Sequence, residues 1–235
     1  MRKTIILILL LSLGSKVTYA QWLLNFGTAA NLQPGKVAFI SGTGAQLTLI
    51  KEPSTTNFTP FLAHAGIRIG LLDNVDIGYR LCTVPLPYSS AGPSLGGAID
   101  LKIRLTPVNA VWQFSVIGGG GLAYVTVMDR SKTAWSPGGA LVLSRNISAT
   151  TSITLNGRYS ESYITTAQGG SRQNYARAIG GSLGLTHTMG DILAVCPEVG
   201  AFDLQGKLGA VPTNGLGLQI GCVLRVNLNK ALHKG

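Results

Sequence analysis

Charged residues are scarce in this chain of 235 residues, at 12% against about 25% in ordinary globular proteins. Acidic residues are the scarcer sign, with 9 Asp and Glu against 19 Lys and Arg, which gives a formal net charge of +10. The basic residues are scattered singly, without the Lys/Arg runs or the aromatic platform of a nucleic-acid-binding surface. We therefore expect no nucleic-acid partner.

Cysteine and histidine are also few, with 3 residues of each type. No CxxC spacing and no His/Cys cluster is present, so we expect no metal. The chain has neither the HExxH helix of a metalloprotease nor a P-loop, and we expect no cofactor. Because His64 is the one histidine on a polar strand face, a barrel hydrolase centred on it is kept only as the last alternative.

Long apolar runs are absent after residue 20, so no membrane-spanning helix is expected there. The first 20 residues do carry an apolar stretch, which follows Arg2 and Lys3 and precedes the small residues around Ala20. This pattern predicts a secretory signal peptide over residues 1–20, cleaved before Gln21.

The rest of the chain alternates between strand patterns and short breaks. We predict ten strands, with eight or twelve as alternatives. Their expected ranges are 36–50, 59–71, 75–84, 94–105, 110–127, 135–145, 147–160, 175–188, 192–204 and 214–228. Most have the roughly ten residues that a tilted strand needs to cross a bilayer.

The expected connections alternate in length. They are tight after the even strands, as at 72–74 and 189–191, and longer after odd strands, as at 85–93 and 161–174. Transmembrane barrels show this alternation, with short periplasmic turns and longer external loops. The fold predicted is an all-β, antiparallel, up-and-down transmembrane β-barrel over residues 36–228.

The two faces of the predicted strands differ in polarity. In the strand at 94–105, Leu101 and Ile103 alternate with Asp100, Lys102 and Arg104. Alternation alone does not tell which face is inside. Three features favour an apolar face that points toward lipid: the predicted signal peptide, the scarcity of charge and the alternating lengths of the connections. The alternative is a soluble exported β-protein that buries its apolar face.

Polar strand faces would then line the lumen. The expected basic lining is Arg68, Arg80, Lys102, Arg104, Arg158 and Arg225, and the expected acidic partners are Asp76 and Asp100. These charges either pair across strands and fill a narrow interior or leave a surplus of arginine along a pore that prefers anions.

Two local features have structural interpretations. Cys196 and Cys222 would lie opposite each other in a regular hairpin, which makes them a candidate disulfide, although Pro197 indicates a bulge that would shift the register. The glycine run at 118–121 is not followed by a helix, so it predicts close backbone approach or a bend rather than a phosphate loop.

The segment from Gly66 to Arg80 resembles the strand–tight turn–strand units of small bacterial outer-membrane β-barrel proteins. The last strand also resembles their terminal assembly signal at Gln219, Gly221, Leu224 and Val226, although aliphatic residues replace its aromatic ones. This resemblance implies the bacterial outer membrane as location, with its lipid and its assembly machinery as partners, and it implies no particular activity. An external partner is not identified.

Residues 21–35 are expected to form a periplasmic N-terminal lead-in, with an edge segment or a short plug as alternatives, and residues 229–235 a short tail. The function expected first is a non-enzymatic structural or surface-interaction barrel. A narrow pore for small anionic solutes is the second, and a hydrolase acting on lipid or peptide is the third.

Overall fold

The computed structural model describes residues 28–51, 54–84, 94–127, 130–164, 174–208, 211–212 and 214–228. The predicted signal peptide and C-terminal tail lie outside these residues. Within them, no helix has the length and apolar character that crossing a membrane would require.

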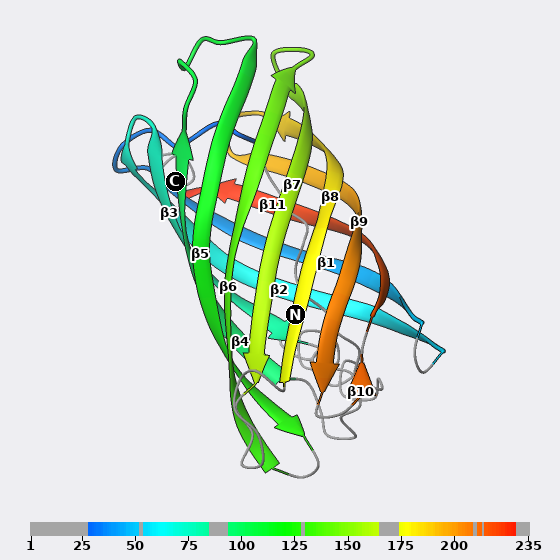
Figure 1. The fold of residues 1–235 in the computed structure, drawn as a ribbon. Helices are drawn as coiled ribbons and strands as arrows, with labels where there is room; N and C mark the ends of the chain where they lie inside the picture. Colours follow the sequence, from blue (N-terminus) through cyan, green and yellow to red (C-terminus); the bar gives the residue numbers. More distant parts are fainter. Residues whose placement is uncertain are drawn as a thin grey trace, which may run out of the picture.

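β-Strands make up nearly all of the described chain (Figure 1). They are β1 (Val37–Ile50), β2 (Thr55–Leu72), β3 (Val75–Val84), β4 (Ser94–Arg104), β5 (Trp112–Val127), β6 (Arg130–Asn146), β7 (Thr151–Ile164), β8 (Asn174–Met189), β9 (Leu193–Leu208), β10 (Val211–Pro212) and β11 (Gly215–Asn227).

The strands close into one antiparallel barrel (Figure 1). Each long strand pairs with the next along the chain, and β11 pairs with both β9 and β1, which closes the wall. The two-residue β10 only extends the hairpin between β9 and β11. The predicted fold class and the count of ten long strands are confirmed.

Connections gather at two ends of the barrel. The turn end carries the tight links between β2 and β3, β4 and β5, β6 and β7, and β8 and β9, and the loop end carries the others. The expected long loops are shorter than predicted at two places, because β2 starts at Thr55 and β6 starts at Arg130. Backbone pairing continues past the apolar pattern, since a ladder hydrogen bond needs no apolar side chain.

The tight turns also differ in detail from the prediction. The link between β6 and β7 spans residues 147–150 rather than Asn146 alone, and the link between β4 and β5 spans 105–111. Strand boundaries are the least reliable part of a prediction from sequence, and these differ by a few positions.

The apolar strand face points outward, as predicted. Ile99 is 54% exposed on β4, whereas Asp100 beside it is 6% exposed and faces the lumen. Aromatic side chains mark both outer rims: Trp112 lies under Arg145 near the turn end, and Trp135 stacks on Tyr163 near the loop end. An outward apolar band between two aromatic girdles is typical of transmembrane barrels.

The glycine run on β5 allows two strands to approach closely. A Cβ atom on Gly119 would lie 2.3 Å from the carbonyl oxygen of Ile99 on β4. The predicted close backbone approach is therefore present, and no helix follows the run.

The predicted disulfide between Cys196 and Cys222 is wrong. Cys196 pairs with Val223, and Cys222 pairs with Pro197, so the ladder is shifted by one residue from the expected register. A shift of one residue turns a side chain to the other face of a sheet. Cys196 consequently faces the lumen, as Glu198 does, and both Cys196 and Cys222 are free thiols.

Candidate functional site in the lumen

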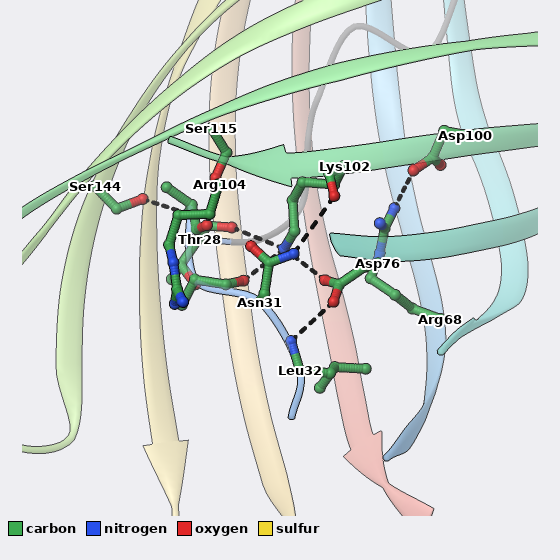
Figure 2. Close-up of polar contacts among 12 residues, drawn as sticks. Thr28, Asn31, Leu32, Arg68, Asp76, Asp100, Lys102, Arg104, Ser115 and Ser144 are labelled. Carbon is green, nitrogen blue, oxygen red and sulfur yellow. Dashed lines mark hydrogen bonds and ion pairs between the residues drawn. The ribbon is translucent and has the colours of Figure 1, made fainter. Parts of the chain in front are cut away.

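Residues 28–35, which we call the plug, lie at the turn end of the barrel, and Figure 2 shows Thr28, Asn31 and Leu32 beside side chains of the lumen. Ala29 is fully buried against Ala140 and Val142 of β6. Its amide donates to Ser144 Oγ at 2.7 Å, and its carbonyl accepts a bond from Ser115 Oγ at 2.5 Å. For these residues a segment inside the barrel replaces the expected periplasmic lead-in, and residues 21–27 lie outside the described chain.

Lys102 and Asp76 hold the next part of the plug. Lys102 Nζ lies 3.1 Å from Asp76 Oδ2 and donates to the Ala30 carbonyl at 2.5 Å and the Thr28 carbonyl at 3.5 Å. Asp76 Oδ1 accepts the Leu32 amide at 3.0 Å. The plug backbone thus supplies hydrogen-bond partners to both members of the buried ion pair (Figure 2).

Gly70 near the end of β2 makes room for the plug. A Cβ atom at this position would lie 2.2 Å from the Gln33 carbonyl oxygen. The Gly70 carbonyl also accepts the Gly35 amide at 2.8 Å, and its amide donates to the Lys36 carbonyl at 2.9 Å. The plug is therefore seated on a position where only glycine fits.

A three-residue charge cluster lies further into the lumen. Asp100 on β4 accepts bonds from Arg68 Nη2 on β2 and, at 3.2 Å, from Arg80 Nη2 on β3. A Cβ atom on Gly78 would lie 2.6 Å from Arg68 Nη2 and 2.9 Å from Asp100 Oδ2, so the absence of a side chain at Gly78 leaves the space that this pair occupies. Three neighbouring strands thus bring together residues that are up to 32 positions apart.

The other expected lining residues are placed differently. Arg104 donates to the Asp73 carbonyl at 2.9 Å, which ties it to the turn between β2 and β3. Arg158 on β7 and Arg225 on β11 belong to lumen-facing rows, and in the described chain neither forms an ion pair with a carboxylate.

A small cavity of about 40 Å³ opens between the plug and the charge cluster. Its polar lining comes from Thr28, His64, Arg68, Arg80, Lys102 and Arg225, and Ile40 and Ile117 add apolar surface. Four of the six basic residues predicted from the sequence therefore meet at one place.

The loop-end half of the lumen has a neutral filling. Phe202 and Leu204 of β9 pack there with Ala176 and Ala178 of β8. Between this cluster and the charges, Gln219 donates to Gln46 at 2.7 Å.

The hydrolase alternative gains little from the geometry. His64 is buried at the cavity, and the residues opposite it in the ladders with β1 and β3 are Gly42 and Cys82. Ser182 stands in a GxSxG spacing, yet it lies inside β8 rather than at a strand-to-helix elbow, and it donates to Glu198. In the described part of the chain, no group of three or more His, Cys, Asp or Glu residues could hold a metal ion.

Comparison with known proteins gives the fold but no family. No protein-family model and no curated protein matches the sequence. An outer-membrane channel from Pseudomonas putida F1 matches with a TM-score of 0.52 and 10% identity over 86% of this chain and 99% of that chain. Neisserial surface protein A matches with a TM-score of 0.41 and 9% identity over 81% and 96% of the two chains. The protein belongs to the class of closed antiparallel β-barrels of the outer-membrane type.

The sequence indicated a plug only as one alternative for residues 21–35, and it gave no sign of the seat on Gly70. Residues 28–32 contribute mainly backbone amides and carbonyls, which carry no residue-type signal. Ser115 and Ser144 did fall on polar strand faces, and that periodicity was the one available sign that they point inward.

Proposed function

We propose that this chain is an outer-membrane barrel that lets small solutes pass through its lumen, with the plug closing the turn end. One observation carries the proposal: lumen side chains hold the plug largely through polar contacts that water can replace. Release of the plug would leave all ten long strands paired. The fold shared with a solved protein described as an outer-membrane channel agrees with this function.

The proposed location is the bacterial outer membrane, reached after cleavage of a signal peptide over residues 1–20. The outward apolar face supports it, as do the aromatic residues Trp112, Trp135 and Tyr163 near its two ends. Outer-membrane lipid and the barrel assembly machinery are the partners that this location requires. By analogy with known barrels, the turn end would face the periplasm.

A Gly70→Val variant tests the function. Its side chain would collide with the Gln33 carbonyl and displace the plug, so conductance in planar bilayers should rise well above that of the wild type. Gly118→Val is the matched control, because a Cβ atom there meets no atom within 4 Å and the residue points outward. Heat-modifiable gel migration shows that each variant is folded.

Lack of conductance in both the wild type and a folded Gly70→Val variant would overturn the pore. The structural or surface-interaction role would then be the better description, in line with a filled lumen. The hydrolase alternative is tested by comparing the hydrolysis of a set of lipids and peptides by the wild type and by His64→Ala. Equal hydrolysis by the two proteins would dismiss it.

A further inference from the structure

Three arginine side chains converge on the cavity above the plug. Arg68, Arg80 and Arg225 reach it from β2, β3 and β11, and Lys102 lies on its border. The cavity volume of about 40 Å³ holds about three water molecules, which is close to the size of a small oxyanion. Donors therefore surround a space that a small ligand can fill.

The positive charges at this cavity exceed the negative ones. Asp100 is shared by Arg68 and Arg80, and Asp76 is paired with Lys102. Arg225 forms no ion pair with any carboxylate of the described chain. A buried charge without a counter-charge is costly, so the geometry favours an added anion.

Two guanidinium atoms at the cavity have unused hydrogen-bonding capacity. Arg68 Nη1 and Arg225 Nε are buried and have no hydrogen-bond partner. A guanidinium group offers planar, charge-assisted donors that match the oxygens of phosphate, sulfate or a carboxylate. Lys102 is already engaged by Asp76 and the plug, so the arginines are the groups left to bind.

We infer that the cavity is a binding site for a small oxyanion, held by Arg68, Arg80 and Arg225. The inference deepens the proposed function, because it names small oxyanions as the solutes that the lumen would select. The site itself does not depend on conduction, since it is present with the plug seated.

Phosphate titration of the refolded protein tests the site. At constant ionic strength, replacing chloride by inorganic phosphate should raise the thermal unfolding midpoint of the wild type, because a ligand that binds only the folded state stabilises it. Arg225→Gln should weaken the apparent phosphate affinity about tenfold or more, and Arg225→Lys should retain part of it. Arg145→Gln removes the same charge outside the lumen and should respond like the wild type.

Two results would overturn the inference: a wild type that responds equally to phosphate and chloride, or an Arg225→Gln variant that responds like the wild type. If Arg225→Gln does not fold, Arg225→Lys is compared with the wild type instead. A phosphate affinity of Arg225→Lys equal to that of the wild type would then overturn the inference. These titrations need no membrane current.

Conductance separates this site from the proposed pore. In the Gly70→Val background, phosphate should reduce the chloride current, and Arg225→Gln should relieve that reduction. A phosphate response in the titration without any current would support the site and overturn the pore. A current that phosphate leaves unchanged, with no response in the titration, would support the pore and overturn the site.

Discussion

The two halves of the lumen are filled in different ways by the same barrel wall. The turn-end half holds the charged residues Asp76, Asp100 and Lys102 together with the plug. The loop-end half holds Phe202, Leu204 and small residues, and among the lumen side chains described there none is charged. One half is therefore organised by electrostatics and hydrogen bonds, and the other by packing.

Packing in the loop-end half depends on the Phe202 ring, which lies against Gly217. A Cβ atom on Gly217 of β11 would lie 2.0 Å from the Phe202 ring, so the ring rests directly on the backbone of the next strand. Removing part of this packing leaves a void, whereas removing one charge of the other half leaves its partners unpaired. The difference predicts which half tolerates single substitutions better.

The largest effect is expected for Asp100→Asn in the turn-end half. The amide cannot neutralise Arg68 and Arg80, and breaking a buried pair on one side costs about 3–5 kcal/mol. Urea unfolding followed by tryptophan fluorescence measures the loss. Asp73→Asn, at an exposed turn, is the control and should change the free energy of unfolding by less than about 0.5 kcal/mol. A loss below about 1 kcal/mol for Asp100→Asn would contradict the charge-based account of this half.

A smaller loss is expected for Phe202→Ala in the loop-end half. Removal of the buried ring should lower the free energy of unfolding by about 3 kcal/mol. This value is at the low end for such changes because lumen side chains and water can move into the space. The same unfolding assay applies, with Ile220→Ala on the outward face as the control. A loss larger than that of Asp100→Asn would reverse the proposed ranking of the two halves.

The smallest effect is expected for Ser144→Ala, because the Ser144 hydroxyl bonds the Ala29 amide of the plug and, in the barrel wall, only the Thr154 hydroxyl. The Ala29 amide loses its acceptor, and one hydrogen bond contributes about 1 kcal/mol. Amide hydrogen exchange at Ala29 should accelerate while exchange in the barrel strands stays unchanged. Ser41→Ala, on the outward face of β1, is the control. Equal acceleration in the strands would mean that the plug and the wall do not open separately.

Much of the barrel could be predicted because lipid and lumen impose a two-residue period on every strand. The strand at 75–84 was predicted with the bounds that it has, and Asp100 and Lys102 were assigned to the lumen face where they lie. The hairpin of β9 and β11 shows the limit. Its strands were found, but a regular hairpin sets Cys196 opposite Cys222, whereas the structure sets Cys196 opposite Val223, one residue away.

Taken by itself, the sequence determined the all-β barrel, the number of long strands and the basic character of the lumen, because composition and periodicity record which faces meet lipid. Only the tertiary structure decided which charges meet, that Gly70 makes room for the plug and Gly78 for the charge cluster, and that residues 28–32 enter the lumen. Those features depend on strand register and on backbone hydrogen bonds between distant segments, and neither is written in the identity of the residues that supply them.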